Sequence, residues 1–231
     1  MKKIGILIPA YNEENTIIKV INRVNTEIAN NFDFRILVID DGSEDNTSQL
    51  VRKQGVELAR HPVSMGPGGA IRTGYIIMKN WDIDYIVQLD ADGQHDPADF
   101  HQLYQKMIDE HLDMVVGSRF LIDNPGLNFV RKFGITFFTW LINFLTGLNL
   151  TDITSGFRVL TSGSLEKVCF SSEKHWTIEM TLLAYKNDLK IGEAPIKVIE
   201  RENGVSQFNE LITFFTYPFR AIKQILTVYL M

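Results

Sequence analysis

Continuous apolar runs alternate with helical patterns through the first half of the chain. The apolar runs predict buried strands at residues 4–8, 34–39, 56–60, 85–87 and 114–116. Helical spacing and helix-start signals predict helices at about residues 17–28, 66–80 and 100–110, and a short helix that ends at Lys53. Strands that are apolar on both faces and alternate with helices are typical of a parallel sheet covered on both sides. The pattern therefore predicts an α/β fold.

Polar residues gather where the predicted strands end. The segments concerned are residues 9–13, 40–43, 90–92 and 117–119. Carboxyl ends of parallel strands share one edge of a sheet, and open α/β sheets bind their ligands at that edge. We therefore expect the functional site there.

Asp90, Asp92 and Gln94 follow the apolar run at residues 85–87. Residues two apart share a face of an extended backbone, so their three side-chain oxygens can converge on one point. Carboxylate and amide oxygens suit Mg²⁺ or Mn²⁺, which proteins often hold together with a substrate phosphate. The first hypothesis is therefore a divalent-metal and diphosphate site.

The same turn has a simpler interpretation. It could be a solvated acidic turn in which Asp96 caps the helix that Pro97 begins. A calcium-binding EF-hand loop that starts at Asp90 is excluded, because His95 and His101 stand where that loop needs glycine and glutamate.

Composition narrows the class of protein. The 231 residues are 45% hydrophobic and 22% charged, as in ordinary folded domains, and residues 1–231 are interpreted as one domain. A net charge of −5 offers no broad positive field, so we expect no nucleic-acid partner. The single Cys169 excludes an internal disulfide framework and suits a reducing compartment. The apolar run at the N-terminus is too short for a signal peptide.

Glycines cluster at residues 66–70. They do not form a dinucleotide fingerprint, because Ile71 occupies the place of the third glycine, and the chain has no Walker A lysine motif. A flexible turn into a helix explains them, and a close backbone approach to a phosphate is the alternative.

Seven motifs in order give the chain a family resemblance. They are IPAYNEE at 8–14, VIDDGS at 38–43, the glycine-rich stretch at 66–74, DADGQH at 90–95, VGSR at 116–119, DITSGFR at 152–158 and RENGVS at 201–206. With them the chain resembles the family 2 glycosyltransferases of the GT-A fold. It looks most similar to the branch that contains dolichyl- and polyprenyl-phosphate sugar synthases.

The resemblance implies an architecture. The GT-A fold has a Rossmann-like, mostly parallel central sheet flanked by helices, and we expect amphipathic or apolar helices in the C-terminal half. Residues 1–120 would form the nucleotide-sugar-binding half, residues 121–210 the acceptor half, and residues 211–231 an amphipathic helical segment.

The resemblance also implies roles for individual residues. Donor-site positions are Pro9, Tyr11, Glu13, Ile39, Asp41, Asp90, Ala91, Asp92 and Arg119. The implied metal ligands for Mg²⁺ or Mn²⁺ are Asp90, Asp92 and Gln94. The implied catalytic residues are Asp92, Arg119 and Asp152, and the implied acceptor-phosphate residues are Arg131, Ser155, Arg158 and Arg201.

Some of these positions have structural alternatives. Arg158 and Arg201 could equally form structural ion pairs, and Glu13 could serve the N-terminus of the next helix. Asp152 would be the general base if the acceptor were a hydroxyl group. A lipid phosphate, with a second pKa near about 6, needs no base, and Asp152 would then only position other groups.

The implied reaction is the transfer of a sugar, with inversion, from GDP-mannose or a UDP-hexose to a polyprenyl or dolichyl phosphate. The alternative within the class is transfer to a surface polysaccharide or a glycolipid. The alternative from another class is a non-catalytic nucleotide-sugar-binding module. Intact Asp90, Asp92, Gln94 and Arg119 argue against that module, because binding alone does not need their charge arrangement.

Residues 133–151 carry no charge and are rich in aromatic side chains. They could form a buried or dimer-interface helix, a helix that lies in a membrane surface, or a membrane span, which is disfavoured by the interrupting Thr and Asn residues. The resemblance favours the membrane surface.

At the C-terminus, apolar residues again follow helical spacing, and Pro218 would divide the region into two helices. The apolar positions are Leu211, Phe215, Phe219, Ile222, Leu226 and Tyr229. We therefore expect a cytoplasmic protein that sits peripherally on the cytoplasmic face of a membrane, with a membrane-protein partner or a second copy of itself.

Overall fold

The computed structural model describes residues 1–28, 32–124, 129–199 and 222–229, with the backbone alone at 129–131. In chain order the elements are β1 (Lys3–Ala10), α1 (Ile17–Ile28), β2 (Asp33–Asp40), α2 (Thr47–Lys53), β3 (Glu57–Arg60), α3 (Gly66–Met78), β4 (Tyr85–Gln88), the 3₁₀ helix η1 (Pro97–Asp99), α4 (Phe100–Asp109), β5 (Met114–Ser118), α5 (Phe129–Thr146), β6 (Arg158–Thr161), the 3₁₀ helix η2 (Ser162–Ser164), α6 (Trp176–Lys186) and β7 (Ile191–Pro195). A further helical segment covers residues 222–229.

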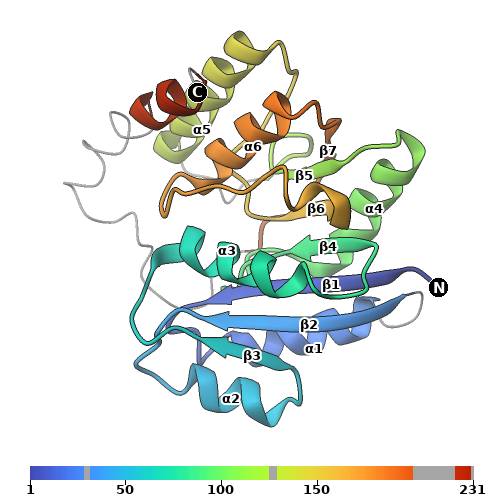
Figure 1. Cartoon of the computed structure of the whole chain (residues 1–231), viewed down its shortest axis with the longest axis vertical. Helices are drawn as coiled ribbons and strands as arrows, with labels where there is room; N and C mark the ends of the chain where they lie inside the picture. Colours follow the sequence, from blue (N-terminus) through green and yellow to red (C-terminus); the bar gives the residue numbers. More distant parts are fainter. Residues whose placement is uncertain (29–31, 125–128, 200–221, 230–231) are drawn as a thin grey trace.

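One sheet organises the molecule (Figure 1). Its seven strands lie in the order β3-β2-β1-β4-β6-β5-β7. All neighbours are parallel except at β6, which runs antiparallel to both β4 and β5. The predicted α/β fold with a mostly parallel sheet is confirmed, and the antiparallel β6 is an addition that the apolar runs did not predict.

The two faces of the sheet carry separate cores. On one face, Ile6 and Val87 pack in a cluster with apolar residues of α1 and α4. On the other face, Leu7 and Ile86 pack with residues of α3 and α6. In Figure 1, α3 lies in front of the strands and α1 behind them. Because successive strand residues point to opposite faces, continuous apolar runs are what a sheet covered on both sides requires.

A third core lies away from the sheet and includes one face of α5. Phe138 and Ile142 of α5 are buried there with Ile178 of α6. The opposite face of α5 is exposed, and Phe133 and Phe144 are 67% and 74% accessible. Within the described residues, every helix falls short of the length and apolarity that a bilayer span needs.

The C-terminal helical segment packs one of its faces on the third core. Ile225 and Val228 join the third core, whereas Leu226 and Tyr229 are 49% and 39% exposed. The amphipathic segment expected at residues 211–231 stays a prediction, because only residues 222–229 of it are described. The residues predicted farther upstream, including Pro218, lie outside the described residues.

Candidate active site

Polar loops meet at one edge of the sheet. β1 and β2 are in register to their ends, where Pro9 pairs with Ile39 and Ala10 with Asp40. β4 is parallel to β1, and β5, on the far side of the antiparallel β6, runs in the same direction. The segments that follow β1, β2, β4 and β5 therefore leave the sheet at the same edge, as the sequence predicted.

Asp41, directly after β2, holds the loop that enters α3. One carboxylate oxygen accepts the backbone N–H of Met65 at 2.9 Å and contacts His61 Nδ1 at 2.6 Å. The other accepts the Ser64 hydroxyl at 2.7 Å and the Gly66 N–H at 2.8 Å. Asp41 is buried, and its four contacts fix the conformation of this loop. Its predicted contact with the donor stays a prediction.

The other predicted donor positions differ in accessibility. Tyr11 is 37% exposed, whereas Ile39 and Ala91 are buried in the cores on the two faces of the sheet. Glu13 lies four residues before α1, and its carboxylate accepts the hydroxyl of Thr16, the residue that precedes the helix, at 2.7 Å. The Glu13 contact supports the alternative that Glu13 serves the N-terminus of α1. Because the side chains of Ile39 and Ala91 are buried, only the backbone of these two residues could contact a donor at the sheet edge.

Asp90 and Asp92 form the turn after β4. The Asp90 carboxylate is 40% exposed and lies 3.6 Å from Nδ1 of the buried His95. Asp92 accepts the backbone N–H of Gln94 at 3.0 Å, which closes a local turn. Gln94 is itself anchored, because its carbonyl accepts the N–H of Ile199 at 3.0 Å. The predicted convergence of the three side chains stays a prediction.

The turn suits a hard divalent cation by the chemistry of its donors. Asp90 and Asp92 supply carboxylate oxygens at partly accessible positions, which is what Mg²⁺ and Mn²⁺ prefer when a phosphate completes the coordination. No group of three or more His, Cys, Asp or Glu side chains in the described part of the chain is arranged to hold a metal alone. A cation held by Asp90 and Asp92 would leave coordination positions for substrate phosphate oxygens. Asp96 caps η1 as predicted, accepting the N–H of Ala98 at 3.1 Å.

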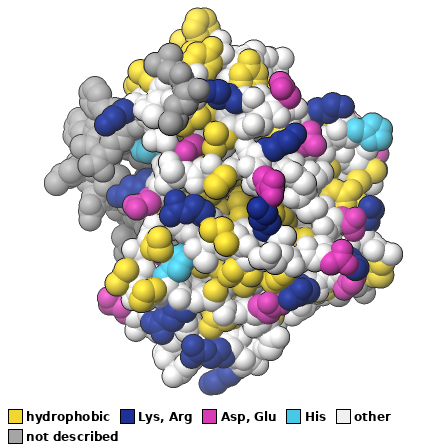
Figure 2. All heavy atoms as spheres, in the orientation of Figure 1, with side chains coloured by type: hydrophobic (Ala, Val, Ile, Leu, Met, Phe, Trp, Pro, Cys, Tyr) yellow, Lys and Arg dark blue, Asp and Glu magenta, His cyan; other side chains and the backbone are white. Residues whose placement is uncertain are grey.

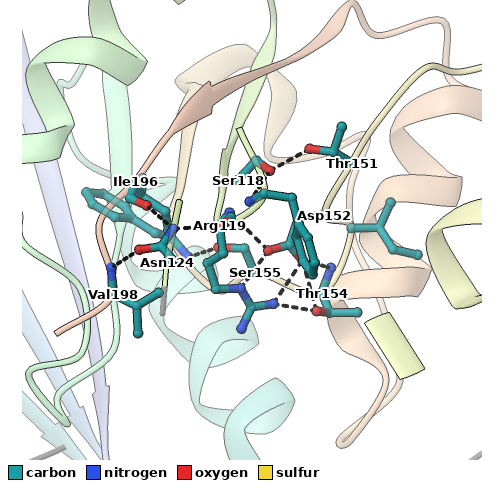
Figure 3. A network of polar contacts seen from close by, with 12 residues as sticks. Ser118, Arg119, Asn124, Thr151, Asp152, Thr154, Ser155, Ile196 and Val198 are labelled. Atoms are coloured by element: carbon teal, nitrogen blue, oxygen red, sulfur yellow. Dashed lines mark hydrogen bonds and ion pairs between the residues drawn. The ribbon is translucent and has the colours of Figure 1, made fainter. Parts of the chain in front are cut away.

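Arg119 and Asp152 form a buried ion pair (Figure 3). Arg119 Nε donates to Asp152 Oδ2 at 2.6 Å and Nη2 donates to Oδ1 at 2.8 Å, so the contact is bidentate. Nη2 also donates to the Thr154 hydroxyl at 2.6 Å. Burial raises the pKa of the Asp152 carboxyl, but the hydrogen bonds and charge of Arg119 outweigh it and hold that pKa below its usual range. Asp152 is thus an ionised group held by Arg119.

Two residues that the sequence did not single out support this pair. The carboxylate of Glu193 in β7 accepts the backbone N–H groups of Thr151 at 2.6 Å and Asp152 at 2.7 Å. Asn124 Nδ2 donates to the carbonyl of Arg119 at 2.7 Å. Glu193 had no signal in the sequence because β7 itself was not predicted, and Asn124 lies beyond the strand-end segment at residues 117–119. His61, by contrast, directly follows β3, so the rule of polar strand ends could have found it.

Arg158 and Ser155 are both buried. Arg158 is fully buried and donates to three backbone carbonyls, those of Ile153 at 2.8 Å, Ser155 at 3.1 Å and Thr177 at 3.1 Å. Burial lowers its pKa to about 10. Ser155 is 1% exposed. The Arg158 guanidinium thus bonds to backbone carbonyls and does not form the structural ion pair offered as its alternative, and the expected phosphate contacts of Arg158 and Ser155 stay predictions.

The other two acceptor arginines are not placed by the structure. Arg201 lies outside the described residues, and Arg131 is in α5 at a position whose side chain is not described. Their predicted contact with an acceptor phosphate stays a prediction.

The glycine-rich stretch packs against protein. Gly68 donates its N–H to the Glu173 carbonyl at 2.9 Å, and a Cβ on Gly68 would stand only 2.1 Å from the Ser172 carbonyl oxygen. Close backbone packing between α3 and residues 171–173 therefore explains this glycine.

Two hollows lie beside β7. One, of about 610 Å³, is lined by α4 and the end of β7, and the other, of about 520 Å³, by β7 and residues 147–151. Glu193 lines both of them, so it faces these hollows as well as the turn that carries Asp152.

Comparison of the sequence with known proteins assigns the chain to a family. The sequence model of "Glycosyl transferase family 2" matches residues 5–169. The chain is 32% identical to the UDP-N-acetylglucosamine–dolichyl-phosphate N-acetylglucosaminyltransferase of Methanococcus voltae, over 96% of this chain and 95% of that protein. It is 29% identical to the polyprenol monophosphomannose synthase of Mycolicibacterium smegmatis, over 88% of this chain and 80% of the relative.

A solved structure supports the fold. Glucosyl-3-phosphoglycerate synthase from Mycobacterium tuberculosis, crystallised with Mn²⁺, uridine diphosphate and phosphoglyceric acid, superposes with a TM-score of 0.78. The match covers 99% of this chain and 78% of that one at 19% identity, which bears on the fold alone. The family match, the strand-end site and the near full-length relative agree. The chain belongs to glycosyl transferase family 2.

Proposed function

We propose that this glycosyltransferase moves a sugar from GDP-mannose or a UDP-hexose to a polyprenyl or dolichyl phosphate, with inversion and with Mg²⁺ or Mn²⁺ at Asp90 and Asp92. The observation that carries the proposal is the half-exposed Asp90 carboxylate at the sheet edge where β1, β2 and β4 end. The names of the Methanococcus voltae and Mycolicibacterium smegmatis relatives support a polyprenyl-type phosphate acceptor.

The proposed reaction requires positive charge near the leaving diphosphate. Breaking a sugar–diphosphate bond builds negative charge on the nucleotide, and the bound cation would offset it there. Arg119 supplies a second positive charge, at the end of β5 on the same edge of the sheet. Its contact with Asp152 uses Nε and Nη2, so the guanidinium is held rigidly in one orientation.

Asp152 positions Arg119 in this proposal and does not act as a base. It is fully buried, and both of its oxygens accept hydrogen bonds from Arg119. A phosphate acceptor, largely dianionic at pH 7 with a second pKa near about 6, attacks without a base. The geometry and the proposed acceptor therefore agree on the same role for Asp152.

A panel reaction tests the proposal. The full chain is incubated with Mn²⁺, with GDP-mannose, UDP-glucose and UDP-N-acetylglucosamine in turn, and with undecaprenyl or dolichyl phosphate. We expect nucleotide release and lipid-linked sugar to rise together with one donor. Nucleotide release that needs a glycan or glycolipid acceptor instead would overturn the acceptor, and tight nucleotide-sugar binding without any release would overturn the enzymatic role.

A further inference from the structure

The turn before β6 lies against the turn after β4. In the antiparallel pair of β4 and β6, Gln88 is opposite Arg158. Extending this register by two residues, forward from Gln88 and backward from Arg158, brings Asp90 opposite Gly156, and the two residues are in contact. The proposed metal ligand therefore has Gly156 as its neighbour across the sheet edge.

The contact between them leaves no room for a side chain. A Cβ on Gly156 would lie 2.8 Å from Oδ2 and 3.0 Å from Oδ1 of Asp90, closer than carbon and oxygen atoms normally approach. Gly156 is not among the residues with positive φ, so the backbone conformation does not demand glycine. The Asp90 carboxylate occupies the space that a side chain would fill.

Hydrogen bonds hold the backbone at Gly156 in place. Its carbonyl accepts a hydrogen bond from Gln88 Nε2 at 2.9 Å, and Gln88 is in turn held by the Tyr75 hydroxyl at 2.8 Å. Arg158 holds the carbonyl of Ser155, the preceding residue. The Asp90 carboxylate, by contrast, ends a side chain that is 40% exposed. A methyl group at Gly156 would therefore displace the carboxylate and leave the turn in place.

We propose that Gly156 is a positioning residue for the divalent cation: by lacking a side chain, it lets the Asp90 carboxylate stand where it can bind the metal. The inference rests on the proposed function, in which Asp90 is a ligand. It also gives the turn at residues 152–156 two tasks, since Asp152 at one end holds Arg119 and Gly156 at the other borders Asp90.

Gly156→Ala tests the inference, and Gly163→Ala is its matched control. A Cβ on Gly163 meets nothing within 4 Å, and Gly163 has no positive φ. Mn²⁺ binding to each full-length protein is measured by electron paramagnetic resonance, with and without uridine or guanosine diphosphate. We expect Gly156→Ala to weaken Mn²⁺ binding by about 10- to 100-fold, as displaced ligand supports do, and Gly163→Ala to bind like the wild type.

The melting temperature, followed by circular dichroism, provides the second readout. We expect it to stay the same in Gly156→Ala, because the exposed carboxylate moves and the turn does not. Wild-type Mn²⁺ binding in Gly156→Ala would overturn the inference, and so would a misfolded or strongly destabilised variant. Asp90→Asn separates the two proposals. If Asp90→Asn binds Mn²⁺ normally, the metal site itself is wrong; if it loses Mn²⁺ while Gly156→Ala keeps it, only the role of Gly156 fails.

Discussion

Asp152 carries a buried negative charge that is paired with the positive charge of Arg119. Its side chain is fully inaccessible, and the Arg119 side chain is 7% exposed. A buried pair of this kind is costly to break by removing one partner, because the other charge stays behind without compensation. The same pair sets the orientation of the proposed catalytic arginine. Loss of either side chain should therefore lower both the stability and the activity of the protein.

Asp152→Asn distinguishes a positioning group from a base. We expect kcat to fall about 100-fold, because a misplaced Arg119 stabilises the leaving diphosphate poorly. The acidic limb of the pH–rate profile, set by the acceptor phosphate near about pH 6, should stay where it is in the wild type. Steady-state rates between pH 5 and 8 measure both quantities. Disappearance of that limb in the variant would assign the base role to Asp152.

The same substitution has a pH signature in stability. The pKa of Asp152 is lowered in the folded protein, so the ionised carboxylate stabilises the fold above the unfolded value of about 3.9. That contribution is lost as the pH falls through the lower folded value. We expect Asp152→Asn to lose roughly 3–5 kcal/mol in urea unfolding at pH 7, and the difference to shrink below about pH 4.

An exposed pair serves as the control for that measurement. Lys79 and Glu166 lie 2.7 Å apart, with side chains 58% and 69% exposed. Glu166→Gln should change the free energy of unfolding little at any pH, because solvent screens such pairs. A pH-independent loss in Asp152→Asn would contradict the account of the buried pair.

Individual site residues were predictable only where the local pattern carried a signal. Asp90 and Asp92 lie two and four residues after the end of β4, so their position at the sheet edge could be predicted from the apolar run. The environment of Arg158 could not, because its partners are the carbonyls of residues 153, 155 and 177, and no pattern marks a carbonyl as an acceptor. The expected phosphate contact of Arg158 therefore stays a prediction, whereas its backbone contacts could be found only in the structure.

Among the elements, the strands of the first half were predictable and those of the second half were not. Continuous apolar runs located β1 to β5 to within a few residues. β6 begins with the buried Arg158, and β7 contains Glu193 and ends at Pro195, so neither shows an apolar run. α6 was missed because Thr177, Glu179 and Thr181 are buried along with its apolar residues, which removes the amphipathic pattern.

The tight packing at the start of α3 predicts that a side chain at Gly68 is destabilising. Gly68→Ala places a methyl group 2.1 Å from the Ser172 carbonyl oxygen, so backbone must shift, and we expect a loss of about 1–3 kcal/mol in urea unfolding. Gly134 of α5 has open space around its Cβ position, and Gly134→Ala should stabilise by about 0.5–1 kcal/mol. Equal effects of the two substitutions would contradict the close packing of α3 on residues 171–173.

The exposed face of α5 carries the prediction of peripheral membrane contact. Trp140 and Phe144 are 58% and 74% exposed and stack with ring centroids 5.8 Å apart. Hydrophobic side chains are visible at the upper end of the molecule in Figure 2, where Figure 1 places the end of α5. Aromatic side chains on an exposed helix face, with Lys132 on the same helix, suit an anionic bilayer surface.

Co-sedimentation with phosphatidylglycerol-containing liposomes measures this contact. We expect the wild type to bind and Phe144→Asp to bind about 10- to 100-fold more weakly, because one buried aromatic contributes about 1.5–3 kcal/mol. Ile76→Asp is the control, since Ile76 is also exposed, at 62%, but lies on α3. Failure of the wild type to bind, or equal losses in both variants, would count against α5 as the membrane-facing element.

At the scale of the whole molecule, the antiparallel β6 joins the two halves of the site. It lies between β4, which leads to Asp90, and β5, which leads to Arg119. The turn that precedes β6 therefore reaches both the proposed donor metal site and the arginine pair. The order of motifs in the sequence predicted the family, but it could not predict this juxtaposition, because Arg119 and Asp152 are 33 residues apart in the chain.

The central claim is that Asp90 and Asp92 hold a divalent cation that binds the donor's diphosphate. A crystal of the full chain grown with Mn²⁺ and the donor nucleotide tests it most directly, because manganese gives its own anomalous signal. We expect a single manganese peak in contact with Asp90 or Asp92 and with two phosphate oxygens. A peak elsewhere, with both carboxylates turned away from the nucleotide, would contradict it.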